Sequence, residues 1–197
     1  QNTTHEFRTP LSTINASAHL MARSDDPEQR KARAHKITQQ VQRITRLVDM
    51  LLKMARLDSA PPEMQTLDVT RWLHNNMDMM EVELGLNNMA YDLADDLPLV
   101  SADAEMLLEA LKPLLDNALR YSAPRSPITL RTNYDAPHVY ISVRDQGIGI
   151  AEGDLPFIFQ MFWRNDGARS TPGLGLGLSV ARQIARVHGG DVLVETT

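Results

Sequence analysis

The sequence contains no cysteine. It therefore has no disulfide framework, no thiolate metal site and no cysteine nucleophile. No apolar run approaches the roughly 20 residues that a membrane-spanning helix needs, and no signal peptide opens the chain. The formal net charge of −5 argues against a surface that coats nucleic acid. We therefore expect a soluble piece of 197 residues, which is enough for one ordinary domain or two small ones.

Glycine is scarce in the first part of the chain, because nine of the ten glycines lie at or beyond Gly147 and none precedes Gly85. Apolar residues in this first part recur in alternating steps of four and three over residues 7–21 and again over 37–55. Such heptad seams, with Ser24-Asp-Asp-Pro27 between them, predict an antiparallel helical hairpin. One hairpin cannot bury both seams, so two copies that form a four-helix bundle are the economical arrangement.

The region after the hairpin alternates between strand-like and helical patterns. Ser59-Ala-Pro-Pro62 cannot continue a helix and predicts a linker. We predict strands at residues 64–69, 89–93, 97–100, 128–133, 139–144 and 192–195, and helices at 70–83 (capped by Thr70), 104–121 and 178–188. Interleaved strands and helices of this kind indicate an α+β two-layer sandwich. The predicted organisation is a helical hairpin at 1–58, a linker at 59–63 and an α+β domain at 64–197.

Two glycine-containing stretches are candidates for binding a nucleotide. Asp145-Gln-Gly-Ile-Gly149 follows a predicted strand; its carboxylate can accept an N–H from a base, and its glycines let backbone approach a ligand. A surface turn would use the same residues. Pro172-Gly-Leu-Gly-Leu-Gly177 opens the last predicted helix, whose N-terminal N–H groups favour phosphate. Flexible loops use this glycine pattern as well.

The first predicted helix carries a histidine beside an acidic residue. A neutral imidazole at His5 is a competent nucleophile, Glu6 can take up the other ring proton, and Thr9 lies one turn further along. An ordinary surface histidine is the alternative. The second predicted helix is rich in basic residues, which we interpret as a solvated face: Arg30, Lys31, Arg33, Lys36, Arg43 and Arg46.

A polar patch also lies within the predicted helix at 104–121. The carbonyl oxygen of Asn117 suits Mg²⁺, which prefers oxygen ligands and substrate phosphates. Arg120 could neutralise phosphate, and Tyr121 could stack on a base. A local hydrogen-bonding feature within the helix is the alternative. Pro113 is an anomaly inside this helix, because proline removes a helical hydrogen bond.

Taken together and in this order, these patches strongly resemble the catalytic core of the bacterial sensor histidine kinases of two-component signalling. His5-Glu-Phe-Arg-Thr-Pro-Leu11 looks like the phosphoacceptor box, and Leu115-Asp-Asn-Ala-Leu-Arg-Tyr121 looks like the asparagine box. Asp145–Gly149 and Gly173–Gly177 look like the two glycine boxes, and Phe159-Gln-Met-Phe-Trp-Arg164 is similar to the phenylalanine box. The resemblance covers essentially the whole chain.

The resemblance implies a dimerisation and histidine-phosphotransfer domain joined to an ATP-binding domain of the Bergerat type. His5 would take the γ-phosphoryl group of ATP, with Glu6 as its acid–base partner. Thr9 would position a water for dephosphorylation of the response regulator. The chain would form a homodimer through residues 5–57 and pass phosphate to an Asp of a receiver domain. It would bind no nucleic acid.

The resemblance also implies ATP and Mg²⁺ as cofactors. Asp145 would read the adenine amine, Asn117 would hold Mg²⁺, and residues 151–174 would form a lid. The residues implied to bind the nucleotide are Asn117, Arg120, Tyr121, Asp145, Gly147, Gly149, Phe162, Arg164, Gly173, Gly175 and Gly177. The chain would be the cytoplasmic, C-terminally truncated piece of a longer membrane-anchored sensor, since only four residues precede His5.

Pro113 departs from the family pattern, because these kinases usually carry another Asn four residues before Asn117. Magnesium coordination would then be weaker or more water-mediated, which leaves open a phosphatase-biased or degenerate nucleotide-binding scaffold. ATP-hydrolysing relatives usually place a water-activating Glu at this position, and its absence argues against an ATP-hydrolysing clamp. The presence of these boxes in order argues against a non-catalytic coiled-coil module.

Overall fold

The computed structural model describes residues 2–59, 61–165 and 175–196. The chain forms two compact units, one made of the described residues up to 59 and the other of those from 61 onward, and each is described by itself. Within these ranges, no helix combines the length and the apolar character that a membrane span requires.

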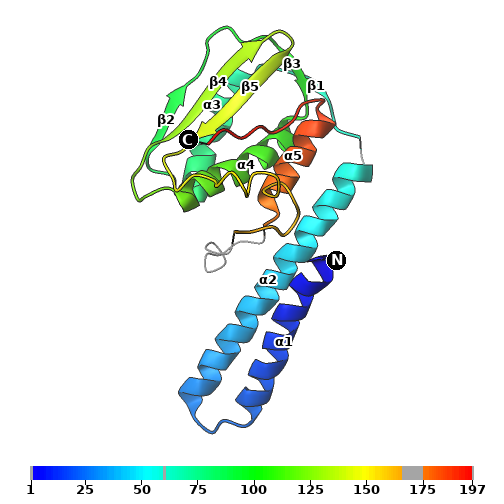
Figure 1. Ribbon diagram of the computed structural model, residues 1–197, viewed down its shortest axis with the longest axis vertical. Coiled ribbons are helices and arrows are strands. Elements are labelled where there is room, and N and C mark those ends of the chain that lie inside the picture. The colour runs from blue at the N-terminus through cyan, green and yellow to red at the C-terminus, as the bar shows by residue number, and fades with distance from the viewer. Residues whose placement is uncertain (1, 60, 166–174, 197) are drawn as a thin grey trace. The chain divides into compact units, whose positions relative to one another are not determined.

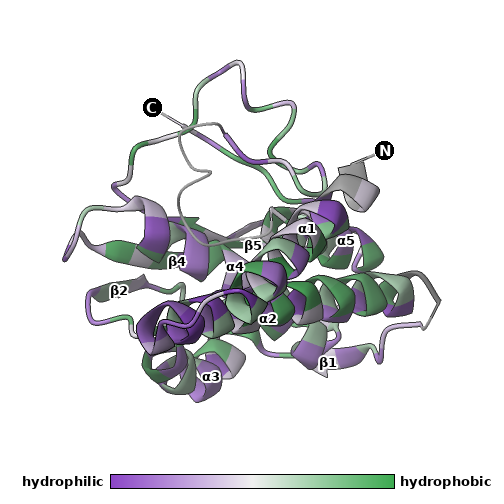
Figure 2. Cartoon of the chain, turned by 90° about the horizontal axis from the view of Figure 1, so that it is seen from below, coloured by the Kyte–Doolittle hydropathy of each residue, from purple (hydrophilic) through white to green (hydrophobic). Residues whose placement is uncertain are grey.

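The first unit is a hairpin of two helices, α1 (Asn2–Ala22) and α2 (Pro27–Ser59), and it confirms the predicted helical hairpin. Asp26 precedes α2, and its side chain accepts a hydrogen bond from the Glu28 N–H at 2.9 Å. This contact satisfies one of the unpaired N–H groups at the helix start. Leu47 and Leu57 on α2 are buried. Figure 2 shows that both helices carry hydrophobic and hydrophilic residues, as amphipathic helices do.

The second unit is an α+β two-layer fold, as predicted (Figure 1). Its elements are β1 (Gln65–Leu67), α3 (Val69–Leu84), β2 (Met89–Asp92), β3 (Val100–Ala102), α4 (Ala104–Tyr121), β4 (Ile128–Asp135), β5 (His138–Arg144) and α5 (Gly177–Val187). Strand β1 pairs with β3, while β2 runs parallel to β4 and β4 antiparallel to β5. Helix α4 packs against α3, α5, β4 and β5.

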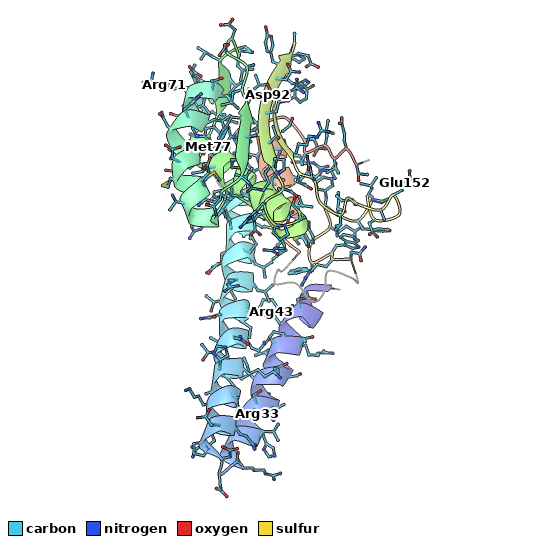
Figure 3. The ribbon with its side chains drawn as sticks, turned by 90° about the vertical axis from the view of Figure 1, so that its left-hand side faces the viewer. Arg33, Arg43, Arg71, Met77, Asp92 and Glu152 are labelled. Atoms are coloured by element: carbon cyan, nitrogen blue, oxygen red, sulfur yellow. The ribbon has the colours of Figure 1, made fainter. Side chains whose placement is uncertain are left out.

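The core of this unit lies between the β2-β4-β5 sheet and the helices. Ile128 and Leu130 on β4 are fully buried, whereas Arg131 on the same strand is exposed, as the period of two along a strand requires. Leu115 on α4 and Met77 on α3 complete the packing. Met77 is labelled in Figure 3. Burial of these apolar side chains supplies most of the favourable free energy of folding.

The start of α3 differs from the prediction. Asp68 caps the helix, not Thr70, because the Asp68 carboxylate accepts a hydrogen bond from the Arg71 N–H at 3.0 Å. The Thr70 hydroxyl is engaged elsewhere and donates to the Ala94 carbonyl at 3.0 Å. Asp and Thr are both good cap residues, so only tertiary contacts decide between them here.

Two predicted strands also differ from the structure. The strand expected at 97–100 is β3 at Val100–Ala102, because pairing with β1 fixes its register. The strand expected at 192–195 does not form in the described part of the chain. That segment is instead followed by Thr196, whose hydroxyl accepts a hydrogen bond from the Ile150 N–H at 3.1 Å. A strand needs a hydrogen-bonding neighbour, and none of the described strands pairs with this segment.

Asp103 joins three separate segments at the start of α4. Its carboxylate accepts from the N–H groups of Glu105 and Met106 at 3.1 Å each and from the Glu63 N–H at 2.9 Å. Its own N–H donates to Nε2 of His188, after the end of α5, at 3.0 Å. Burial raises the pKa of the Asp103 carboxyl, but the backbone N–H groups of Met106, Glu63 and Glu105 outweigh burial and lower that pKa overall.

We expect Asp103→Ala to lower the free energy of unfolding by about 2 kcal/mol at pH 7, because the cap of α4 is lost and the Glu63 N–H also loses its acceptor. Asp68→Ala is the matched control and removes the cap of α3, for a loss of about 1 kcal/mol. Urea unfolding measures both variants.

The pH dependence follows from the lowered pKa of Asp103 in the folded state. Stability from the carboxylate is present at neutral pH and is lost as the pH falls below about 4 and through the folded-state pKa. The difference between wild type and Asp103→Ala should therefore shrink in acid. A difference in the free energy of unfolding that is equal at neutral and at acidic pH would contradict this account of Asp103.

Candidate active site

The phosphoacceptor box lies in the first turns of α1. His5, Glu6 and Thr9 are all helical, and the side chain of His5 lies outside the described residues. The Glu6 carboxylate accepts a hydrogen bond from Nη2 of Arg43 on α2 at 3.1 Å, and these side chains are 31% and 37% exposed. The Thr9 backbone carbonyl accepts from the Thr13 hydroxyl at 3.1 Å. The carboxylate next to His5 in sequence is thus held by a cation from the neighbouring helix.

Arg43 is a site residue that the sequence reasoning missed. It was assigned to a solvated face, and four of the six basic residues in that assignment are exposed: Arg30, Lys31, Lys36 and Arg46. Arg43 is half-buried, and its Nε is buried without a hydrogen-bond partner in the described part of the chain. Figure 3 shows its side chain between α2 and α1. It lies four residues before the buried Leu47, so the helical period already placed it on the packed side of α2.

In the second unit, the end of α4 and the first glycine box contact each other directly. Ser122 forms a backbone bridge with Gly147, and the Ile148 N–H donates to the Tyr121 carbonyl at 3.2 Å. A Cβ on Gly147 would lie 2.6 Å from that carbonyl oxygen, so the approach requires glycine here. The Asp145 carboxylate accepts from the Gly147 N–H at 2.8 Å and stays exposed to solvent. Asp145 is therefore fixed beside the asparagine box.

Asn117 and Arg120 lie in the last turns of α4. Nη2 of Arg120 donates to the Asp116 carboxylate at 2.6 Å, so the predicted phosphate ligand is paired within its own helix. Asn117 is half-buried. Among the described residues no cluster of three or more His, Asp or Glu could hold a metal. Mg²⁺ that arrives with nucleotide phosphates needs only one or two protein ligands, and the Asn117 amide oxygen fits that need.

The phenylalanine box is joined to the second glycine box. The Phe162 N–H donates to the Gly175 carbonyl at 2.8 Å, and both residues have positive φ, 65° and 67°. A Cβ on Gly175 would lie 2.6 Å from the Trp163 carbonyl oxygen. Phe162 is buried, so its ring packs inside the unit, while Arg164 is half-buried. Gly173 and the rest of the predicted lid from residue 166 onward lie outside the described residues.

Pro113 contacts the first residue of α5. A Cβ on Gly177 would lie 2.8 Å from the Cβ of Pro113, so α4 and the start of α5 can approach this closely only with glycine at 177. The proline that departs from the family pattern thus has a packing role, and no ligand atom stands at its position. Sequence reasoning identified both residues but gave no signal that they touch.

Comparison with known proteins is consistent with this geometry. A family model described as "His Kinase A (phospho-acceptor) domain" matches residues 1–60, and one described as "Histidine kinase-, DNA gyrase B-, and HSP90-like ATPase" matches residues 102–197. The chain is 32% identical to the sensor histidine kinase YkoH of Bacillus subtilis (strain 168), over 100% of this chain and 44% of that protein. It is 30% identical to the signal transduction histidine-protein kinase/phosphatase MprB of Mycobacterium sp. (strain KMS), over 98% and 39%.

The fold is also that of a solved kinase. The histidine kinase ThkA, crystallised in complex with the response regulator protein TrrA, gives a TM-score of 0.71 at 22% identity, over 96% of this chain and 54% of that one. The chain spans less than half the length of the two curated relatives it matches. By its two family models and these relatives, the chain belongs to the bacterial sensor histidine kinases, a family of protein-histidine kinases, and carries their catalytic core.

Proposed function

We propose that this chain transfers the γ-phosphoryl group of ATP to His5 and then to an aspartate of a response regulator. The observation that carries the proposal is the fixed contact between the end of α4 and the first glycine box, which sets Asp145 beside the asparagine box. In the first step a bond forms between a ring nitrogen of His5 and the γ-phosphorus, and the bond from that phosphorus to the β–γ bridging oxygen breaks. ADP leaves, and Glu6 takes up the proton of the other ring nitrogen.

The nucleotide would be held by the residues that α4 and the two glycine boxes bring together. Asp145 would accept the adenine amine, and Tyr121 would stack near the base. Arg120 would turn from Asp116 to a phosphate, because both are anions and the guanidinium can exchange one for the other. Arg164 would supply a second positive charge. Phosphoryl transfer depends mainly on such positioning and charge neutralisation.

Magnesium ion, when bound with the nucleotide, would neutralise the phosphate charge that develops during transfer. Asn117 would hold it through the amide oxygen. Pro113, one turn earlier on α4, offers no second ligand. Coordination would therefore rest on one protein oxygen together with phosphates and water.

Arg43 would prepare Glu6 for proton transfer. The ion pair between them fixes a carboxylate immediately after His5 in the helix. A carboxylate held by a charged donor has its position fixed before proton transfer begins. The half-exposed setting keeps the pair weak enough for the carboxylate to exchange partners.

The hairpin would act as a homodimer through residues 5–57. Several apolar side chains of α1 and α2 are between 40% and 55% exposed in the single chain: Leu11, Leu20, Val41, Val48 and Leu52. A second hairpin would bury them, at about 25 cal/mol for each Å² of apolar surface removed from water. The membrane anchor and the cytoplasmic placement of this piece stay predictions.

Dephosphorylation of the response regulator is a second activity of the same helix. One relative is named a kinase/phosphatase. Thr9 is exposed on α1, one turn after His5, and its hydroxyl would position the attacking water. Because Pro113 offers no ligand for Mg²⁺, the balance between kinase and phosphatase activity could favour the phosphatase. Dephosphorylation of the regulator would then be strong while transfer from ATP is weak.

The kinase proposal predicts that γ-labelled Mg-ATP labels the wild-type chain. His5→Gln removes the acceptor, and Asp145→Asn removes the carboxylate that reads adenine, so both variants should lose the label. Its chemistry should be that of a phosphoramidate, stable in base and lost in acid. Label that persists in His5→Gln would overturn the assignment of His5, and binding of ADP without any labelling of the wild type would favour the scaffold alternative.

The site geometry predicts that Gly147→Ala weakens ADP binding at least tenfold, because the new methyl group meets the Tyr121 carbonyl and must shift Asp145. Gly153→Ala is the matched control, because a Cβ there meets nothing within 4 Å. Titration calorimetry should give an affinity within about twofold of wild type for this control. Equal affinities of the two variants would count against the proposed adenine site.

The phosphatase proposal predicts that Thr9→Ala slows dephosphorylation of a phosphorylated response regulator about tenfold or more, while labelling of His5 changes less than about threefold. Thr13→Ala is the matched control, since Thr13 lies one turn further and its hydroxyl donates to the Thr9 carbonyl. Loss of regulator phosphate over time, without ATP, gives both rates. The same slowing in both variants would point to a disturbed helix and argue against a role for the Thr9 hydroxyl.

A further inference from the structure

Arg182 on α5 connects two segments that are distant in sequence. Its guanidinium carbon lies 4.5 Å from the centre of the Phe159 ring, in the phenylalanine box. Its Nε and Nη2 donate to the two carboxylate oxygens of Asp191 at 2.6 and 2.9 Å. A cation over an aromatic face is attracted by the ring quadrupole, and a two-point hydrogen bond to a carboxylate is among the stronger polar contacts in proteins.

Asp191 orients the guanidinium of Arg182. Hydrogen bonding from Arg182 lowers the pKa of the Asp191 carboxyl well below its usual range, and the same bond raises the pKa of Arg182. Arg186 adds a weaker contact to Asp191 at 3.6 Å. Because the guanidinium is planar and its fork is filled by Asp191, its face is left to rest on Phe159.

The phenylalanine box has little regular structure of its own. The segment from Ala151 to Trp163 is a run of turns closed by backbone hydrogen bonds between near neighbours. Ile158 and Phe162 are buried within the unit. Phe162 is tied to Gly175 just before α5, and Phe159 is held by Arg182 on α5 itself. Both contacts connect this segment to α5 or to the residues just before it, so α5 determines where the segment lies.

We propose that Arg182 is a positioning residue for the phosphate side of the nucleotide site, with Asp191 as its clamp. Arg182 fixes Phe159 on α5, and Arg164 follows Phe159 by five residues in the same short segment. Loss of the contact would let Arg164 move, whereas Asp145 and Tyr121 are held by the separate contact between α4 and the first glycine box. The inference rests on the proposed function, because it takes Arg164 as a phosphate ligand.

The test compares ATP with adenosine, which lacks phosphates. Arg182→Met replaces the arginine by an apolar side chain of similar length and so removes the charge. We expect ATP to bind about three- to tenfold more weakly, the range that one cation–aromatic contact supports, and adenosine to stay within about twofold of wild type. Arg182→Lys, which keeps a charge but has no fork, should recover part of the ATP affinity. Arg186→Met is the matched control from the next turn and should leave both ligands within about twofold.

A double-mutant cycle of Arg182→Met with Phe159→Leu identifies the contact itself. The two changes should be clearly less than additive for ATP affinity, because either one removes the same interaction. Asp191→Asn should give an intermediate loss and serves as the test if Arg182→Met does not fold by circular dichroism. Equal weakening of ATP and adenosine, or an additive cycle, would overturn the proposal. A wild type that binds adenosine and ATP equally well would refute the phosphate site itself, which is a distinct failure.

Discussion

The second unit depends on the close approach of two glycine residues to helix α4. The backbone of Gly147 lies against the Tyr121 carbonyl at the end of this helix, and Gly177 lies against the Pro113 ring in its middle. A Cβ at either glycine would fall within 3 Å of α4, which real Cβ atoms do not tolerate. Helix α4 therefore fixes the positions of both the first glycine box and the start of α5. Helix α4 is in turn fixed by Leu115 in the core and by the Asp103 cap.

Charged side chains in this unit act mainly as connectors between segments. Asp103 gathers backbone N–H groups from two segments, and Arg182 links the phenylalanine box to Asp191. Isolated surface ion pairs contribute little to stability in water, and neither group is one of these. Asp103 is buried and accepts from backbone N–H groups, and Arg182 binds Asp191 at two points. Their effect is to restrict where poorly structured segments can go. This is the kind of restriction that a nucleotide site needs, because ligand groups must be held before the substrate arrives.

Local pattern was enough to predict the elements but not their contacts. The heptad seams predicted α1 and α2, and the boxes predicted the order of the site along the chain, because both signals lie within short stretches of sequence. Three contacts could not be predicted in this way: the cap at Asp68, the pairing of Arg43 with Glu6 and the contact of Arg182 with the Phe159 ring. Each is a choice between chemically suitable residues that only the folded chain decides. The missing strand at 192–195 has the same origin, since a strand exists only where a neighbour pairs with it.

Pro113 shows how a departure in a motif can be structural. The proline removes one helical hydrogen bond, yet α4 continues from Ala104 to Tyr121 without a break. Its ring fills the space against Gly177, so an amide at this position would have to share that space with α5. The site thus exchanges a possible ligand for a fixed helix contact. In the proposed site, a single amide oxygen from Asn117 would hold the metal, so more of the charge neutralisation would fall to arginines. The position of α5 and of the phenylalanine box would then control how well the phosphates are held.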